Sequence, residues 1–220
     1  DVTESNEDNN IFGPYDQEVT EDTSPPSISH TSVKVAYKGI SVSISSIVTD
    51  NVEVSSVTVY YRKGGGTSYS SIYAISTGND TYEALIPGSA VTERGLEYYI
   101  KAEDAYGNIA TLPEENASLS PYTVRVNFSS LSFPFPTLQK KWQMISVPVS
   151  LDSANVDSVL VDDLGAQDNI IWKLYRWNTI NGSYDEYPDI PDNFTPGKAF
   201  WLITKDSKNI DVGEGKNTDT

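Results

Sequence analysis

Residues 95–108 read Gly-Leu-Glu-Tyr-Tyr-Ile-Lys-Ala-Glu-Asp-Ala-Tyr-Gly-Asn, a run that alternates in polarity until it reaches turn residues. Because successive side chains of a strand point to opposite faces, the apolar members of the run share one side. These members are Leu96, Tyr98, Ile100 and Ala102. Gly107 supplies the positive φ of a bulged type I turn. The run therefore predicts a half-buried strand that leads into a hairpin.

Similar alternation recurs on both sides of this strand as far as residue 127. The earlier runs cover residues 40–45, 57–61, 70–75 and 82–86, and glycine, proline or asparagine turns lie between them. Residues 109–112 begin the last strand, which we expect to resume at residues 122–126 after an excursion flanked by prolines. Short strands at this spacing are typical of a β-sandwich. The sequence therefore predicts a mainly β chain, with a β-sandwich over residues 24–127.

The composition narrows the class of protein. A length of 220 residues allows two domains of about 100 residues each. The chain has no cysteine, which excludes disulfides and thiolate zinc sites. Its net charge of −16 argues against nucleic acid and anionic membrane surfaces as partners, since both are bound by clustered lysine and arginine. Without an apolar run of about 18–20 residues, we expect no insertion into a membrane.

The first 22 residues carry much of the negative charge. They include eight aspartates and glutamates and no lysine or arginine. Like charges repel and few apolar groups compensate, so residues 1–23 are predicted to be a solvated acidic linker or arm. The alternative is that residues 11–15, Ile-Phe-Gly-Pro-Tyr, form a small hook that docks on a neighbouring module.

Residues 128–220 are predicted to form a second β-rich module. All four tryptophans lie there, and the prolines at 134 and 136 predict a stiff hinge before it. Strands are expected at residues 142–148, 170–177, 184–187 and 198–204. One short helix is expected between the first two, because apolar residues follow the helical i, i+3, i+4, i+8 spacing and end at a glycine. These residues are Val156, Val159, Leu160, Leu164 and Gly165. We expect residues 211–220 to be a severed connection that leaves an open sheet edge, so that the module is truncated at its C-terminus.

Several short motifs lie along the first module. They are Pro25-Pro26-Ser-Ile, Asp50-Asn51-Val52, Val59-Tyr60-Tyr61-Arg62, Tyr82-Glu-Ala-Leu-Ile-Pro87, Tyr98-Tyr-Ile-Lys-Ala-Glu-Asp104 and Gly107-Asn108. In content and spacing this set resembles the Ig-like, fibronectin type III-like modules of bacterial extracellular proteins. The resemblance implies that Tyr98 is the tyrosine whose hydroxyl pins a corner of such sandwiches.

The second module has a motif set of its own. It consists of Trp142 to Pro148, Val159 to Gly165, Trp172 to Trp177, Tyr184 to Tyr187 and Phe194 to Thr204. This set is similar to a module found late in large secreted bacterial proteins, often after Ig-like repeats. The two resemblances imply a non-catalytic structural or adhesive module of a secreted or cell-surface bacterial protein, such as a spacer, surface-layer element or filament component. We expect neighbouring modules or like subunits to pair with it through sheet edges.

Catalytic residues are scarce. His30 is the only histidine, whereas acid–base and nucleophilic catalysis usually recruit His, Cys or Lys beside a carboxylate. The adjacent pairs Asp162-Asp163 and Asp185-Glu186 diverge on a helix or a strand, so neither forms a dyad by itself. We therefore predict that the chain is not an enzyme, and a dyad assembled from distant carboxylates stays open as the alternative.

Two predicted loops carry candidate calcium ligands. Asp50 and Asn51 follow the second strand, while Asp104 and Asn108 lie at the hairpin. Calcium prefers several oxygen ligands from carboxylates and carbonyls, which these loops would offer if they share one end of the sandwich. Asp and Asn are also the residues that such turns require, so turn chemistry alone is the competing interpretation.

Aromatic side chains offer a second candidate site, for cell-surface glycans. The candidate stacking residues are Trp172, Tyr175, Trp177 and Tyr187. Alternation puts Trp172 on one face of its strand, with Tyr175 and Trp177 on the other, and one of these faces must be core. Core packing is the competing interpretation of these rings. A glycan site would make the chain a carbohydrate-binding accessory module of a secreted polysaccharide-degrading enzyme, which is the alternative function.

Overall fold

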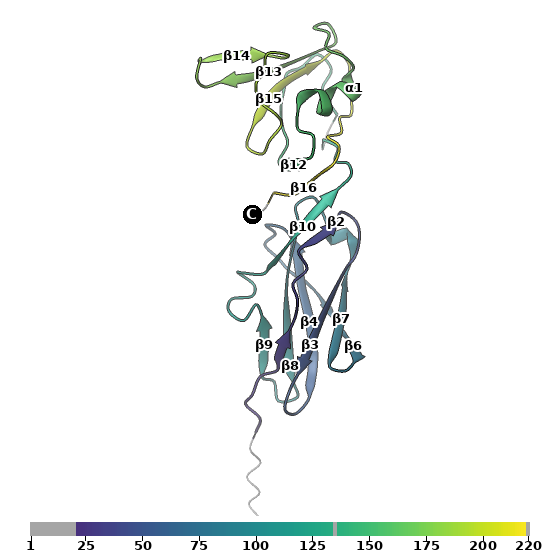
Figure 1. Cartoon of the computed structure of the whole chain (residues 1–220), viewed down its shortest axis with the longest axis vertical. Helices are drawn as coiled ribbons and strands as arrows, with labels where there is room; N and C mark the ends of the chain where they lie inside the picture. Colours follow the sequence, from purple (N-terminus) through teal and green to yellow (C-terminus); the bar gives the residue numbers. More distant parts are fainter. Residues whose placement is uncertain (1–20, 134–135, 219–220) are drawn as a thin grey trace, which may run out of the picture.

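The computed structural model describes residues 21–133 and 136–218. This part of the chain is mainly β, with several antiparallel sheets and one short helix, so the predicted fold class is confirmed (Figure 1). The acidic arm up to residue 20, with its hook at residues 11–15, lies outside the described ranges, as do residues 134–135 of the proline hinge. None of the described helices has the length and apolar character needed to cross a membrane.

The first module is a sandwich of two sheets. One sheet has the order β1 (Ser27–Ser29), β3 (Val42–Thr49), β7 (Thr81–Ile86) and β6 (Ile75–Gly78). The other contains, in order, β10 (Tyr122–Phe128), β8 (Leu96–Asp104), β4 (Val54–Lys63) and β5 (Ser70–Tyr73). Two short strands join this second sheet, since β2 (Val35–Tyr37) pairs with β10 and β9 (Ile109–Leu112) pairs with β8. A 3-10 turn, η2 (Gly88–Ala90), follows β7.

Alternating side chains hold the two sheets face to face. On β8 the predicted inward row is fully buried, and it consists of Leu96, Tyr98, Ile100 and Ala102. On β3 every second residue from Val42 to Val48 is buried in the same way. Burying a large aliphatic side chain contributes about 1.5–3 kcal/mol relative to leaving it in water. The facing rows are therefore the main source of stability in this module.

The last strand of the sandwich is split, as predicted. β9 pairs with the C-terminal half of β8, and β10 pairs with residues 96–98 at its start. Residues 113–121 leave the sheet between the two strands. From Arg125 onward β10 has no partner on β8 and pairs with β2 instead. The strand therefore runs beyond the end of the sandwich, toward the second module.

A buried tyrosine ties the loop between β1 and β2 to the core. The Tyr98 hydroxyl accepts a hydrogen bond from the N–H of Val33 at 2.9 Å and lies 2.8 Å from Nε2 of His30. His30 Nδ1 is 2.7 Å from the carbonyl oxygen of Ser45, which can only accept, so in the neutral ring Nε2 accepts from Tyr98. Burial raises the pKa of Tyr98 to about 12, which keeps the hydroxyl protonated. Both ring nitrogens of His30 thus serve to hold strands together.

The second module packs a four-stranded antiparallel sheet against a short helical segment. The sheet has the order β11 (Gln143–Ser146), β15 (Ala199–Thr204), β13 (Trp172–Asn178) and β14 (Ser183–Glu186). The helical segment is a π-helical turn, η3 (Asp157–Val161), followed by α1 (Asp162–Leu164) and ended by Gly165. Its Val159, Leu160 and Leu164 are buried in the core that it forms with the sheet. The helix predicted from their spacing is therefore confirmed.

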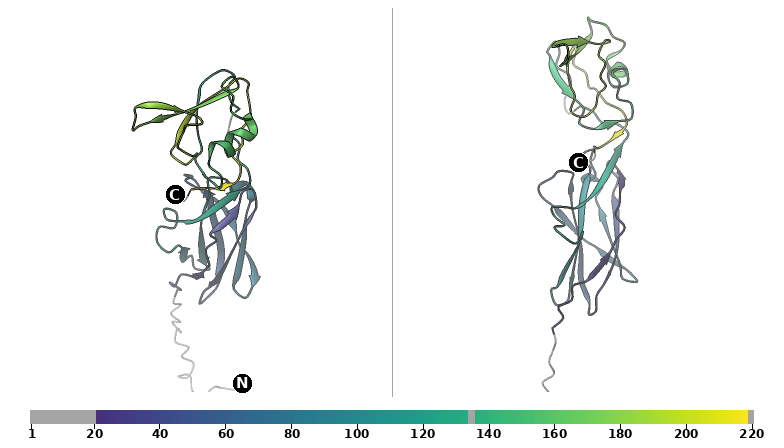
Figure 2. Two further views of the ribbon diagram at one scale, coloured as in Figure 1. Left: turned by 45° about the horizontal axis from the view of Figure 1, so that its top comes forward. Right: turned by 60° about the vertical axis from the view of Figure 1, so that its left-hand side comes forward.

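The junction between the modules contains more than the connecting chain. β16 (Gly215–Lys216) pairs antiparallel with both β10 and β12 (Ser150–Leu151). Asn217 continues this contact, because its N–H donates to the carbonyl of Val126 at 3.1 Å and its side-chain oxygen accepts from the N–H of Val126. The two modules lie end to end, as both figures show (Figures 1 and 2). Residues 215–216, within the segment that we expected to be a severed connection, thus pair with two strands.

Tyr98→Phe removes the hydroxyl and keeps the ring. The N–H of Val33 and Nε2 of His30 then lose their partner in a part-buried site, so we expect the free energy of unfolding to fall by about 1–3 kcal/mol. Urea denaturation followed by circular dichroism measures the change. Tyr73→Phe, at a side chain that is 75% exposed, is the control and should leave the midpoint unchanged. Equal midpoints for the wild type and Tyr98→Phe would contradict this role of the hydroxyl.

Candidate functional site

The outer side of the sheet in the second module carries a group of aromatic residues, here called the aromatic face. Its members are Trp142, Tyr175, Trp177, Tyr184 and Trp201, and all but the half-buried Tyr175 are exposed. Strand register brings them together, since Tyr175 lies opposite Trp201 and Trp177 lies opposite Tyr184. Trp142 immediately precedes β11, and its ring centroid is 5.5 Å from that of Tyr175. This side of the sheet is therefore apolar although it faces solvent.

The rings surround an open depression of about 430 Å³, lined by Trp142, Tyr175, Tyr184 and Trp201. The ring of Tyr184 meets its neighbours edge to face, with centroids 5.0 Å from Trp177 and 6.5 Å from Tyr175. Edge-to-face contacts are favoured by the ring quadrupoles and hold the rings in fixed orientations. Pockets of this size are typical of sites for small ligands.

Polar groups border the aromatic face where β13 meets β14. Nζ of Lys173 lies 3.2 Å from the carboxylate of Glu186, which also accepts a hydrogen bond from the hydroxyl of Tyr175. The hydrogen bond from Tyr175, reinforced by the ammonium of Lys173, holds the pKa of Glu186 below its usual range. A ligand on the rings would therefore find an ionised acceptor and a cationic donor beside them.

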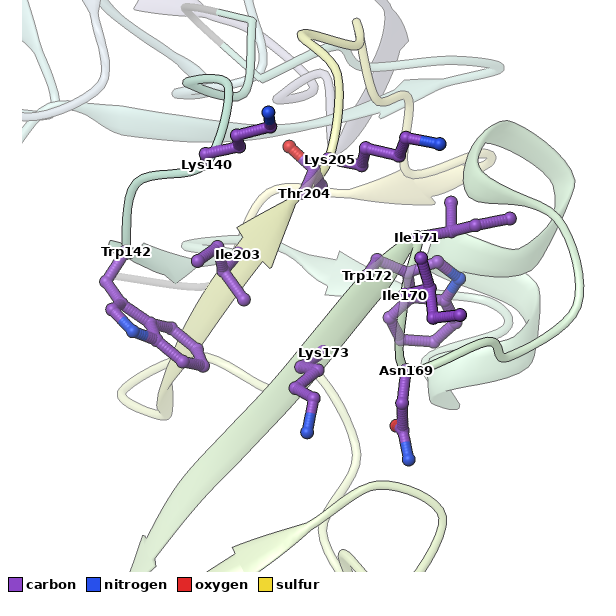
Figure 3. A pocket seen from close by; sticks show the side chains of 10 residues that line it. All are labelled: Lys140, Trp142, Asn169, Ile170, Ile171, Trp172, Lys173, Ile203, Thr204 and Lys205. Carbon is purple, nitrogen blue, oxygen red and sulfur yellow. The ribbon is translucent and has the colours of Figure 1, made fainter.

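A second hollow, of about 250 Å³, adjoins the aromatic face at Trp142. Figure 3 shows Trp142 and Ile170 on opposite sides of this hollow, with Ile203 between them. Ile170 is 77% exposed, and Lys140 and Lys205 are also exposed at the rim. The apolar surface of the second module thus extends from β14 across the sheet to the loop that precedes β13.

The predicted stacking residues are divided between the two sides of the sheet. Tyr175 and Trp177 belong to the aromatic face, but Trp172 is only 1% exposed and lies in the core. The indole N–H of Trp172 donates to the carbonyl of Gly165 at 3.1 Å, and Tyr187 stacks on the indole with centroids 5.3 Å apart. The hydroxyl of Tyr187 donates to Asp157. The structure therefore corrects the prediction for Trp172, whose ring lies in the core between the sheet and the helical segment. Tyr187 is half-buried and packs against the same core.

Three members of the aromatic face were missed by the sequence analysis, namely Trp142, Tyr184 and Trp201. Residues 199–204 do contain a signal, because Trp201 lies between the apolar residues Phe200 and Leu202, which are both buried. Alternation therefore identifies Trp201 as outward-facing. It does not identify the neighbouring strands, and the aromatic face exists only because β15 lies between β11 and β13.

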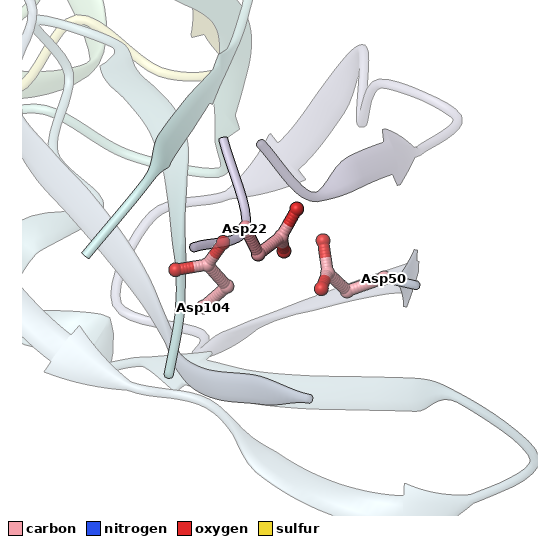
Figure 4. A group of neighbouring side chains, drawn as sticks. All are labelled: Asp22, Asp50 and Asp104. Carbon is pink, nitrogen blue, oxygen red and sulfur yellow. The ribbon is translucent and has the colours of Figure 1, made fainter. Parts of the chain in front are cut away.

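Three aspartates meet at the end of the first module that is remote from the second (Figures 1 and 4). Asp22 precedes β1, Asp50 follows β3 and Asp104 ends β8, yet their carboxylate oxygens lie within 4.8 Å of one another. Two of these residues, Asp50 and Asp104, belong to the predicted set of four calcium ligands. Asp22 was missed, because its acidic neighbours placed it in the predicted arm.

The two asparagines of the predicted calcium set have different positions. Asn51 is exposed to solvent. Asn108 lies at the cluster, where its side-chain N–H group donates to Asp104 at 2.7 Å and to the backbone carbonyl of Asp22 at 2.9 Å. Asn108 therefore links two segments of the acidic cluster by hydrogen bonds.

The adjacent carboxylate pairs have partners that stabilise local structure. Asp163 accepts a hydrogen bond from the N–H of Asp211 at 2.7 Å, and Asp185 accepts one from the side chain of Asn178 at 2.9 Å. Each bond joins two segments of the second module. These carboxylates thus have a structural use that needs no catalytic role.

No protein-family model and no curated protein matches the chain. Function is therefore inferred from three features of the molecule, which are the aromatic face, the acidic cluster and the junction between the modules.

Trp172→Ala and Trp177→Ala distinguish the two sides of the sheet. Removing the buried indole of Trp172 leaves a cavity, so the free energy of unfolding should fall by about 3–5 kcal/mol. Trp177 is 47% exposed, and its replacement should lower this free energy by about 1 kcal/mol or less. Guanidinium titrations measure both values. Equal losses for the two variants would contradict the division between core and aromatic face.

Proposed function

We propose that the chain is a non-catalytic structural and adhesive module of a secreted or cell-surface bacterial protein, in which the first module holds the second in a fixed position. One observation carries this proposal: a single strand belongs to both modules. Val126 and Phe128 lie two residues apart on β10, yet Val126 belongs to the first core and Phe128 to the second.

Sharing a strand restricts movement at the junction. Rotation of one module against the other would expose Val126 or Phe128, whose side chains are 0% and 6% exposed. It would also break the pairing of β16 with β10 and β12. Domains joined by a plain linker lack these restraints and are expected to move relative to each other. A fixed junction suits a spacer, a surface-layer element or a filament component.

The aromatic face supports the adhesive part of the proposal. Contiguous exposed apolar surface marks sites of interaction, and aromatic residues are enriched at the centres of interfaces. Trp142 and Trp177 are each nearly half exposed, and Met144 beside them is 62% exposed. The resemblance of both modules to parts of secreted bacterial proteins supports the proposed location.

Gly215→Val tests the fixed junction. A Cβ at residue 215 would lie 2.5 Å from the carbonyl oxygen of Ser150 and 2.9 Å from the ring of Phe128, so a valine forces β16 away from its partners. Small-angle X-ray scattering should show a single elongated particle for the wild type and a wider distribution of shapes for Gly215→Val. Glu214→Ala, at an exposed side chain of the same segment, should scatter as the wild type does. Identical scattering from Gly215→Val would contradict a rigid junction held by β16.

The alternative function is a carbohydrate-binding accessory module of a secreted polysaccharide-degrading enzyme. The depression on the aromatic face favours it, because sugar rings have apolar C–H faces that stack on aromatic rings and hydroxyls that need polar partners. Lys173 and Glu186 offer such partners at the edge of the depression.

Affinity electrophoresis in gels with soluble neutral polysaccharides tests this alternative. The double variant Trp142→Ala/Trp201→Ala removes two rings from the depression and should weaken retardation about tenfold or more, since central aromatic residues contribute most to binding. Tyr73→Ala removes an exposed aromatic residue from the first module and should migrate as the wild type does. A wild-type protein that no polysaccharide retards would remove the alternative and leave the structural proposal in place.

A further inference from the structure

The acidic cluster concentrates negative charge without any compensating cation among the described residues. The carboxylates of Asp22, Asp50 and Asp104 come from three segments far apart in the sequence and point toward one another (Figure 4). The ion pairs found within residues 21–133 and 136–218 lie elsewhere in the molecule. Like charges at this separation repel, the more strongly where solvent is partly excluded. A cation bound between the carboxylates would relieve this repulsion.

Asp22 and Asp50 each use one carboxylate oxygen for a local turn. Oδ1 of Asp22 accepts from the N–H of Ser24 at 3.0 Å, and Oδ1 of Asp50 accepts from the N–H of Val52 at 2.9 Å. Turn chemistry, the competing interpretation of these residues, accounts for these oxygens. It leaves the second oxygens unexplained.

The second oxygens of two aspartates are buried without a partner. Oδ2 of Asp22 and Oδ2 of Asp50 are inaccessible to solvent and accept no hydrogen bond from residues 21–133 or 136–218. A buried polar atom that lacks a partner costs about 1–3 kcal/mol, and more when it is charged, so such atoms are rare in native proteins. A cation between the carboxylates would satisfy both atoms at once.

Asp104 is prepared to act as the third ligand. Its side chain is 2% exposed, and its burial works against ionisation. Hydrogen bonds from Asn108, Tyr106 and Gly107 outweigh the burial and hold the pKa of Asp104 below its usual range. The same hydrogen bonds hold the carboxylate in a fixed orientation at the cluster.

From this geometry we propose that the acidic cluster binds one calcium ion. The site offers only oxygen ligands, which hard cations such as Ca²⁺ prefer. Zinc and copper sites rarely consist of oxygen ligands alone. Ca²⁺ accepts several protein oxygens in a flexible geometry, whereas Mg²⁺ demands a near-ideal octahedron and usually keeps several waters. One carboxylate oxygen from each of the three aspartates lies within 4.8 Å of the others, close enough for a single Ca²⁺ to bind all three.

The ion would tie the acidic arm to the sandwich. Asp22 lies in the chain that leads into β1, whereas Asp50 and Asp104 belong to loops of the sandwich itself. Asn108 donates a hydrogen bond to the carbonyl of Asp22, and a calcium ion would add a second link between Asp22 and the sandwich. Calcium binding thus fixes the direction in which the arm leaves the first module. This holds whether or not the chain serves as a rigid spacer.

Calorimetric titration of the full chain, treated with EDTA and dialysed, tests the proposal with CaCl₂ as the ligand. We expect one ion per chain, with a dissociation constant of about 10⁻⁴–10⁻³ M, the range of extracellular calcium-binding modules. Calcium at ten times this constant should raise the thermal midpoint by about 5 °C. Asp50→Asn and Asp22→Asn should each weaken binding about tenfold or more. Glu83→Gln removes one negative charge from an exposed position on β7 and should bind as the wild type does.

Hydrogen exchange locates the ion. Calcium should slow exchange at the N–H groups of residues 22–24 in the wild type and in Glu83→Gln. It should have no such effect in Asp22→Asn. Residue 22 lies outside every strand, so this substitution should leave folding intact. Absence of binding heat with the wild type would overturn the proposal. Wild-type affinity in Asp22→Asn and Asp50→Asn, or unchanged exchange at residues 22–24 of the wild type on adding calcium, would place the ion elsewhere and overturn it as well.

Discussion

Strand β10 is the element on which both cores depend. Side chains two residues apart on a strand point the same way, so Val124, Val126 and Phe128 form one continuous row. The row starts in the first core and ends in the second, because β10 runs past the end of β8. β16 can lie against it only where residue 215 has no side chain. The two modules are thereby fixed to each other by packing as well as by hydrogen bonds.

The aromatic residues of the second module divide into two groups with different uses. Trp172, Phe194 and Phe200 fill its core, while the aromatic face lies on the other side of the same strands. The acidic cluster lies at the opposite end of the first module (Figure 1). Changes at sites so far apart, without shared partners, are expected to act independently. The aromatic face and the acidic cluster are thus separate sites, one on each module.

Sequence patterns predicted which segments form strands or a helix better than they predicted which strands lie side by side. Alternation identified the inward row of β8 and the split last strand, and helical spacing identified the segment with Val159, Leu160 and Leu164. Strand order is a non-local property that alternation does not contain, so Trp201 was not placed beside Tyr175. Asp22 was missed for a similar reason, since its cluster forms only when three distant segments fold together. Trp172 and Tyr187 were predicted to lie on a binding surface. Alternation separates the two faces of a strand rich in aromatic residues, but it does not show which face packs against the core.

The position of Asn217 beside Val126 has a mechanical consequence. A pulling force applied between residues 21 and 218 would pass from the sandwich directly into β16, through its pairing with β10, and would bypass residues 129–214. As long as that pairing holds, the tryptophan-bearing module carries no load and keeps its shape under tension. If the pairing breaks first, the bypassed segment is released as extra length, which would let the chain yield without rupture of the sandwich.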